Sequence, residues 1–155
     1  MNTASLELCK ELYELSWWDN DRTLTWQHVK RSVHNDEWEE LGSEDRVLDH
    51  HQIKDYNWEN KHDAVYSEFI CPAYDIGYLM RKLPDSIWSD KYEQKASLWT
   101  RKNLSDYSVW YWVGNSKDGS GTSSEYSAVA DTPENALCRL AIELFKTGIL
   151  KREGR

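Results

Sequence analysis

The stretch from residue 130 to residue 148 constrains the fold most strongly, because it describes one amphipathic helix with both of its ends marked. Thr132 is a favoured N-cap residue, and Pro133 suits the first helical turn. Gly148 can adopt the left-handed conformation that ends a helix. Apolar residues follow one helical face at Ala136, Leu137, Leu140, Ala141, Leu144 and Phe145. The pattern predicts a C-terminal helix that covers the hydrophobic core.

The other patterned segments predict two further helices and several strands. Helical spacing occurs over 3–15 and 76–83, and strand-like patterns occur over 23–29, 64–70, 94–100, 107–113 and 123–130. The polar loop at 114–121 lacks the spacing of a phosphate-binding loop and predicts a hairpin connection. This order predicts an α+β fold, with an antiparallel sheet of about four to five strands covered by helices.

The length of 155 residues favours one domain, and 9 Trp and 9 Tyr provide large apolar areas for its core. The segment 31–61 is the exception, because it is acidic and lacks clear caps or periodicity. Within it, 47–53 fits either a short helix or a strand. We therefore predict a single α+β domain over 1–155 with an acidic insertion at about 34–63, which we expect to be functional or mobile.

The acidic insertion carries nearly all of the formal net charge of −8. Residues 34–63 contain 10 acidic and 3 basic side chains, a net charge of −7, and aromatic rings are interleaved with them. Such a segment is often only a solvated charged face. It can also steer a basic surface towards anchoring rings. The predicted partner-binding residues are Glu37, Trp38, Glu39, Glu40, Glu44, Asp45, Asp49, Asp55, Tyr56, Trp58 and Glu59.

The same charge predicts the kind of partner. Carboxylates repel phosphates, so we expect no direct nucleic-acid partner. A protein with a basic surface, such as one that itself holds nucleic acid, is the expected partner, and the acidic segment would then act as a nucleic-acid mimic.

Catalytic and metal-binding patterns are weak. The adjacent His50 and His51 point apart in a helix or a strand, so we expect no metal ion there. His28 and His34 are candidates for acid–base chemistry with Asp36 or Glu37, but no motif supports them. We therefore predict a chain that is not an enzyme and has no catalytic residues and no cofactor.

The three cysteines also fit a structural role. Cys9, Cys71 and Cys138 are far apart and lack metal-site spacing, which favours buried thiols in a reducing compartment. The sequence shows no signal-peptide pattern and no apolar run of membrane-spanning length. A cytoplasmic protein without a membrane partner is expected.

Two segments carry a resemblance to a known family. The run P-A-Y-D-I-G-Y-L-M-R-K-L-P at 72–84 and the run A-D-T-P-E-N-A that opens the C-terminal helix are similar to those of small phage and prophage proteins described as phage ABA-sandwich domains. The resemblance covers the first helix and about the last half of the chain. It implies a phage-encoded protein in the bacterial host cytoplasm, and it supplies no catalytic residues. The three strands followed by a helix that opens Thr-Pro-Glu are also weakly similar to HicB-type antitoxins. The order of elements resembles double-stranded-RNA-binding domains as well, but Asp131 and Glu134 stand where those domains are basic, so RNA binding is not expected.

Three functional hypotheses remain open. The first is a phage-encoded protein-binding module, an inhibitor of a host defence system that acts through the acidic segment. The second is a protein that binds or sequesters a small ligand such as a nucleotide, with Trp110 and Trp112 lining a pocket. The third is a structural or assembly protein of the phage.

Overall fold

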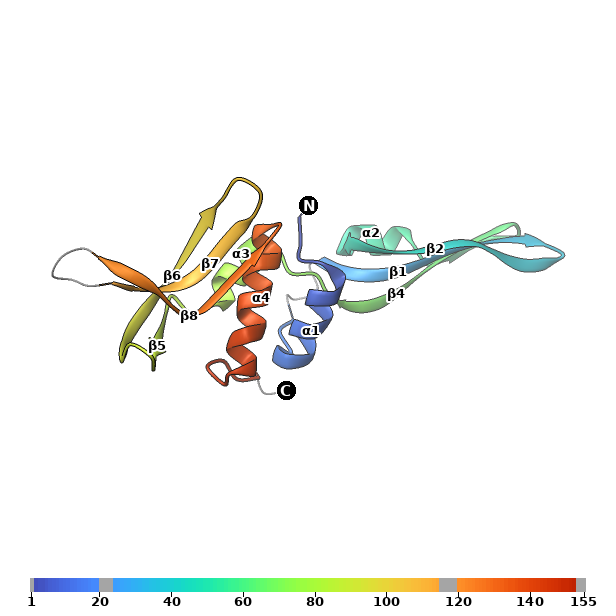
Figure 1. The fold of residues 1–155 in the computed structure, drawn as a ribbon. Coiled ribbons are helices and arrows are strands. Elements are labelled where there is room, and N and C mark those ends of the chain that lie inside the picture. The colour runs from blue at the N-terminus through green and yellow to red at the C-terminus, as the bar shows by residue number, and fades with distance from the viewer. Residues whose placement is uncertain (1, 20–23, 115–119, 153–155) are drawn as a thin grey trace. The chain divides into compact units, whose positions relative to one another are not determined.

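The computed structural model describes residues 2–19, 24–114 and 120–152, which form an α+β fold (Figure 1). The predicted fold class and the capped C-terminal helix are therefore confirmed. The strands of the described residues form two antiparallel sheets of four strands each, whereas the sequence pattern predicted one sheet of four to five. No helix of the described part is long and apolar enough to cross a membrane.

The chain divides into two compact units. Unit 1 comprises Met1–Trp18 and Tyr74–Arg155, and unit 2 comprises Asp19–Ala73. In the sequence, unit 2 has 13 acidic and 6 basic residues, a net charge of −7, whereas unit 1 has 14 acidic and 13 basic residues, a net charge of −1. The negative charge of the chain is therefore concentrated in unit 2.

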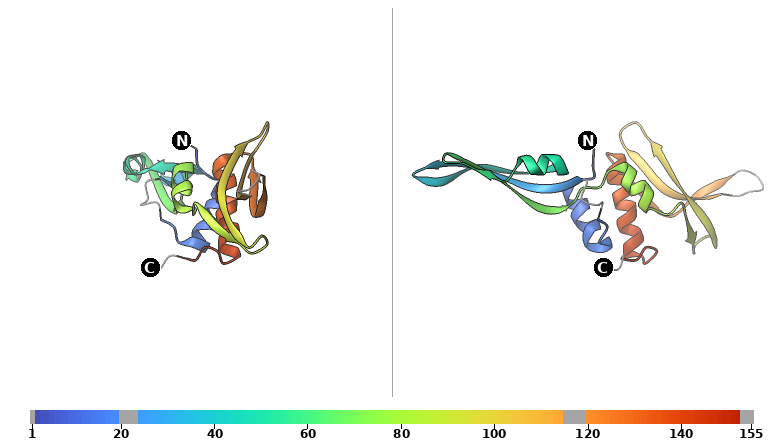
Figure 2. Two further views of the ribbon diagram at one scale, coloured as in Figure 1. Left: turned by 90° about the vertical axis from the view of Figure 1, so that its left-hand side faces the viewer. Right: turned by 180° about the vertical axis from the view of Figure 1, so that it is seen from behind.

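Unit 1 consists of helices and one sheet. The helices are α1 (Leu6–Ser16), α3 (Ile76–Lys82) and α4 (Pro133–Lys146). Sheet B has the strand order β5 (Ser86–Ser89), β6 (Gln94–Lys102), β7 (Tyr107–Gly114) and β8 (Gly121–Ala130). α4 lies along β7 and β8 and covers one face of this sheet (Figure 2).

α4 forms as its sequence predicts. The Thr132 hydroxyl accepts a hydrogen bond from the Asn135 N–H at 3.1 Å, which satisfies one free donor at the start of the helix. The apolar stripe is fully buried at Leu137, Leu140 and Leu144. After the helix, Gly148 has a φ of 83°, the left-handed conformation expected of it.

Two buried tyrosines connect loops to the core of unit 1. The Tyr74 hydroxyl donates to the Trp18 carbonyl oxygen, and the Tyr111 hydroxyl donates to the Pro84 carbonyl oxygen at 2.7 Å. Both residues are completely buried. Burial raises the pKa of both hydroxyls well above the usual value near 10, because the interior disfavours a phenolate.

Unit 1 is therefore expected to lose stability above about pH 10. Tyrosines of the unfolded chain ionise there, whereas Tyr74 and Tyr111 keep their protons in the folded state. Above this pH the folded state therefore binds more protons than the unfolded state, so the free energy of unfolding falls as the pH rises. The contribution of the two tyrosines is complete below the tyrosine pKa of the unfolded chain and is lost as the pH rises towards their pKa in the folded state. Urea unfolding at neutral and alkaline pH should show a smaller alkaline loss for a Tyr74→Phe, Tyr111→Phe double variant than for the wild type. Equal losses would contradict this role for the two tyrosines.

Unit 2 is built around a long antiparallel hairpin. Its elements are β1 (Leu24–Asn35), β2 (Glu37–Asp49), α2 (His50–Asp55), β3 (Trp58–Glu59) and β4 (Asp63–Pro72). The strands form sheet A in the order β2-β1-β4-β3, so that β2 is an edge strand. The hairpin turns at Asp36, whose φ of 71° is in the left-handed region that aspartate tolerates better than most residues.

A small core holds α2 against sheet A. It contains Val29 from β1, Leu48 from β2 and Val65 from β4, with Ile53 and Tyr56 packed against them. This cluster fixes the face of the sheet on which α2 lies, which is called the α2 face below.

The start of α2 is closed by reciprocal hydrogen bonds. The Asp49 carboxylate accepts from the Gln52 N–H at 2.8 Å, and the Gln52 side-chain oxygen accepts from the Asp49 N–H at 2.9 Å. The segment 47–53, for which the sequence left helix and strand open, contains both, because β2 continues to Asp49 and α2 begins at His50.

Three strands, β2, β3 and β5, lie in segments without a clear pattern. β2 is rich in Glu and Asp, which have low strand propensity, and it forms through pairing with β1 along the whole length of that strand. β5 has only four residues. The predicted loop at 114–121 lies mostly outside the described residues, but its ends, Gly114 and Gly121, are paired as a hairpin requires.

Candidate functional site

The candidate site is the exposed surface of β2 and of the elements that follow it in unit 2. Every residue from Glu37 to Arg46 is exposed on this edge strand. β2 carries seven of the predicted partner-binding residues, Glu37, Trp38, Glu39, Glu40, Glu44, Asp45 and Asp49. The other four lie in α2, directly after it or in β3, and they are Asp55, Tyr56, Trp58 and Glu59.

The acidic side chains of β2 project from both faces of sheet A. Side chains alternate along a strand, and paired residues share a face. Glu44 pairs with Val29, which is buried under α2, so Glu44 lies on the α2 face. Asp45 pairs with His28 and lies on the opposite face. The pairing places Glu37, Glu39 and Glu44 on the α2 face, and Trp38, Glu40 and Asp45 on the other.

The predicted residues therefore do not form one continuous negative patch. The physical reason is the alternation of a strand, which the sequence could not reveal while β2 was unassigned. A bulge adds to this, because Leu41 lies unpaired between the Ser32–Glu40 and Arg31–Gly42 pairs.

Some of these carboxylates form ion pairs or hydrogen bonds with neighbouring side chains of unit 2. The Asp45 carboxylate is 2.7 Å from His28 Nδ1, and the Glu44 carboxylate is 3.3 Å from the Arg46 guanidinium. Glu59 accepts a hydrogen bond from the Tyr66 hydroxyl at 2.6 Å. This bond and the nearby charge raise the pKa of Tyr66.

The carboxylates at the tip of the hairpin have no such partner. Within the described residues, Glu37, Glu39 and Glu40 form no ion pair and no side-chain hydrogen bond. They follow one another closely on an exposed strand, so their mutual repulsion is relieved only by solvent and counterions. Among the described residues of β2, the negative charge without a cationic partner is therefore concentrated at this end of the hairpin.

One exposed aromatic ring lies among the carboxylates of β2, and a second lies on β3, the opposite edge strand of sheet A. Trp38 is 44% exposed, and its ring contacts the His34 imidazole edge to face, with ring centroids 5.1 Å apart. Trp58 is 43% exposed on β3. Large exposed rings are costly to leave in water and are common anchors of protein interfaces.

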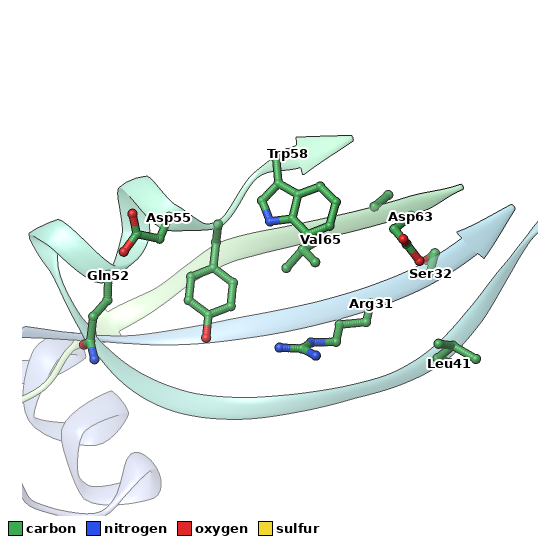
Figure 3. Close-up of a pocket in the computed structure, with 10 residues that line it drawn as sticks. Arg31, Ser32, Leu41, Gln52, Asp55, Trp58, Asp63 and Val65 are labelled. Carbon is green, nitrogen blue, oxygen red and sulfur yellow. The ribbon is translucent and has the colours of Figure 1, made fainter. Parts of the chain in front are cut away.

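The α2 face has a hollow of about 460 Å³ beyond the end of α2 (Figure 3). Arg31, Val65 and Trp58 are cross-strand neighbours on β1, β4 and β3, and they project into it from the same side of the sheet. Tyr56 and Leu41 also line the hollow. A second hollow of about 460 Å³ shares Arg31 and Leu41 with the first, so the two hollows adjoin on the hairpin, and together they are called the groove below.

The groove combines rings with charges of both signs. Asp55 and Asp63 line it together with Arg31, whose guanidinium forms no ion pair within the described part of the chain. A planar guanidinium can hold a carboxylate through two hydrogen bonds, and carboxylates can receive lysine or arginine side chains. This arrangement suits a polypeptide with mixed charges.

The histidines that the sequence offered for acid–base chemistry or metal binding do not line the groove. His28 contacts Asp45 and not Asp36 or Glu37, and His34 contacts Trp38, so neither histidine has the predicted partner or lines the groove. His50 and His51 are both exposed on α2. Among residues 2–19, 24–114 and 120–152, no cluster of His, Cys, Asp or Glu side chains could hold a metal ion.

Three features of the site were missed from the sequence. Arg31, Leu41 and Val65 were not predicted to contribute to it. Val65 had a usable signal, because it belongs to the strand-like stretch at 64–70, but its pairing could not be deduced. Arg31 lies just after the predicted strand at 23–29 and had none. Leu41 depends on the bulge and had none.

The rings of the small-ligand hypothesis lie elsewhere. Trp110 and Trp112 are half-buried on β7, in sheet B of unit 1. They do not contribute to the groove of unit 2.

Comparisons with protein-family models, with curated proteins and with solved structures give no match to this chain.

Proposed function

We propose that this chain is a non-catalytic protein-binding module that binds a basic surface of another protein through β2 and the adjoining groove. The observation that supports it most is that Glu37, Glu39 and Glu40 lie close together on an exposed edge strand. No cation from the described residues neutralises them.

Charge and rings have different parts in this proposal. The unpaired carboxylates accelerate encounter with a basic surface and make association sensitive to salt. Trp58 and Leu41, 43% and 66% exposed, provide apolar surface that a partner can bury. Repulsion between two such strands disfavours edge-to-edge pairing of two copies, so the expected partner is a different protein.

We take the origin of the module from the resemblance to phage ABA-sandwich domains, and its purpose from the acidic hairpin. A phage-encoded protein in the cytoplasm of a bacterial host meets defence proteins with basic grooves that hold nucleic acid. A narrow hairpin with carboxylates on both faces can enter such a groove as a mimic of nucleic acid and inhibit its owner.

Reversal of charge at the tip of the hairpin tests the proposal. Affinity capture from a host lysate should recover a partner with the wild-type chain, and higher salt should release it. A Glu37→Lys, Glu39→Lys, Glu40→Lys variant should bind that partner at least about tenfold more weakly, because attraction becomes repulsion.

A matched variant separates local charge from net charge. Glu7→Lys, Glu14→Lys, Glu143→Lys changes the formal charge equally at three exposed positions in the helices of unit 1. It should bind nearly as well as the wild type. Equal weakening by both variants, or unchanged binding by the hairpin variant, would refute the proposal.

A further inference from the structure

A second surface, on sheet B of unit 1, is unlike the acidic hairpin in both charge and composition. One face of sheet B is covered by α4, and its buried residues include Val109, Tyr111 and Val113 on β7. The residues that alternate with them form the opposite face. That face carries Trp88, Trp99, Trp110 and Trp112 with Lys95 and Arg101, and these six residues are called the tryptophan face below.

The four rings are arranged on three neighbouring strands. Trp99 on β6 pairs with Trp110 on β7, and Trp88 on β5 pairs with Lys95 on β6. Trp112 follows two residues after Trp110 on the same face. With ordinary strand dimensions, the positions of the four rings extend roughly 10 Å across the strands and roughly 14 Å along them.

The tryptophan face is exposed to an unusual degree for such large rings. Trp88 is 54% exposed and Trp99 is 52% exposed. Burying these rings would be favourable, so an exposed group of them marks a surface that meets a ligand.

Trp112 is held in place by its neighbours. A Cβ atom at Gly121 would lie 2.5 Å from the Trp112 ring, so the ring rests directly on the backbone at Gly121. Its centroid is 6.1 Å from that of Trp99. The Trp112 ring is therefore fixed in its position on the tryptophan face.

Beside the rings, the face provides polar groups that suit a phosphate-bearing ligand. Arg101 and Trp110 line a hollow of about 290 Å³ together with Ser108, Ser123 and Ser127. Arg101 and Lys95 are exposed cations. The carboxylate of the nearby Glu125 accepts a hydrogen bond from the Ser89 hydroxyl at 2.8 Å.

We infer that the tryptophan face binds single-stranded nucleic acid. Bases stack on aromatic side chains in a sequence-tolerant way, while cations and hydroxyls hold the sugar–phosphate chain. The cations are complementary to a polyanion. The open, extended face suits several successive nucleotides better than one enclosed small molecule. A duplex does not expose the faces of its bases, so an unpaired strand is required.

This inference is independent of the proposed function, because it concerns the other unit. It also departs from the expectation that the chain has no nucleic-acid partner. That expectation rests on the acidic segment, whereas nearly all of the excess negative charge belongs to unit 2.

The test is binding of the full chain to a fluorescein-labelled 15-nucleotide oligothymidine strand, measured by fluorescence anisotropy at low salt. The wild type should bind saturably, and Trp99→Ala should bind about tenfold more weakly, because one stacking ring is lost. Arg101→Gln should weaken binding and reduce its dependence on salt. Phe69→Ala removes an exposed ring from β4 of unit 2, outside the groove, and should leave binding unchanged.

Circular dichroism of each variant establishes that it is folded, which is expected because Trp99 and Phe69 are exposed. Absence of saturable binding, or equal binding by Trp99→Ala and the wild type, would overturn the inference. Equal weakening by Phe69→Ala would also overturn it. If thymidine monophosphate competes as effectively as the unlabelled strand, the tryptophan face is a site for a single nucleotide, and the inference of a strand-binding site is wrong.

Discussion

Replacing Leu140 with alanine is expected to lower the free energy of unfolding by about 2–5 kcal/mol. Leu140 is completely buried in α4, on the stripe that covers sheet B. The substitution removes apolar area from the core and leaves a cavity that the neighbouring side chains fill only in part. Urea unfolding followed by tryptophan fluorescence measures the loss.

Leu104→Ala is the matched control, because Leu104 lies in unit 1 and is fully exposed. Its effect should stay within about 0.5 kcal/mol. A loss at Leu140 as small as the loss at Leu104 would show that α4 does not cover the core as described.

Leu48→Ala is expected to destabilise unit 2 by a similar amount, about 2–5 kcal/mol. Leu48 is 1% exposed on β2, and it shares a small core with Val29 and Val65. Because few other buried apolar side chains hold α2 on the sheet, this loss is a large part of what stabilises the unit. Hydrogen exchange should show faster exchange of the amides of β1, β2 and β4.

Leu41→Ala provides a control on the same strand. Leu41 is 66% exposed at the bulge, so its removal should change stability by no more than about 0.5 kcal/mol. If Leu41→Ala accelerates exchange in β2 as much as Leu48→Ala does, the core of unit 2 has been placed wrongly.

The parts of the fold that the sequence predicted are those with strong local signals. Thr132, Pro133 and Gly148 mark the ends of α4 by backbone chemistry, and Leu137 and Leu140 follow its apolar spacing. These signals do not depend on distant residues. The same holds for β7, where β-branched and aromatic residues favour a strand.

β2 could not be predicted, for a physical reason. Its residues 37–46 are all exposed, so no apolar alternation marks the strand. It exists because β1 provides a complete line of backbone partners and because Leu48 attaches its end to the core. Pairing of this kind is set by the whole hairpin and not by local preference.

The candidate site was predictable in composition and not in arrangement. The clustering of Glu37, Glu39 and Glu40 is visible in the sequence, and so is the presence of Trp58. The separation of the carboxylates onto two faces depends on the register of β1 and β2. The groove depends on cross-strand neighbours such as Arg31 and Val65, which lie far apart along the chain.

A hydrogen-exchange footprint of the chain with its captured partner tests the acidic hairpin as a binding surface most directly. The amides of residues 37–46 and 56–59 should exchange more slowly in the complex than in the chain alone, while those of sheet B stay unchanged. Slower exchange confined to unit 1, with β2 as fast as in the absence of the partner, would contradict the proposal.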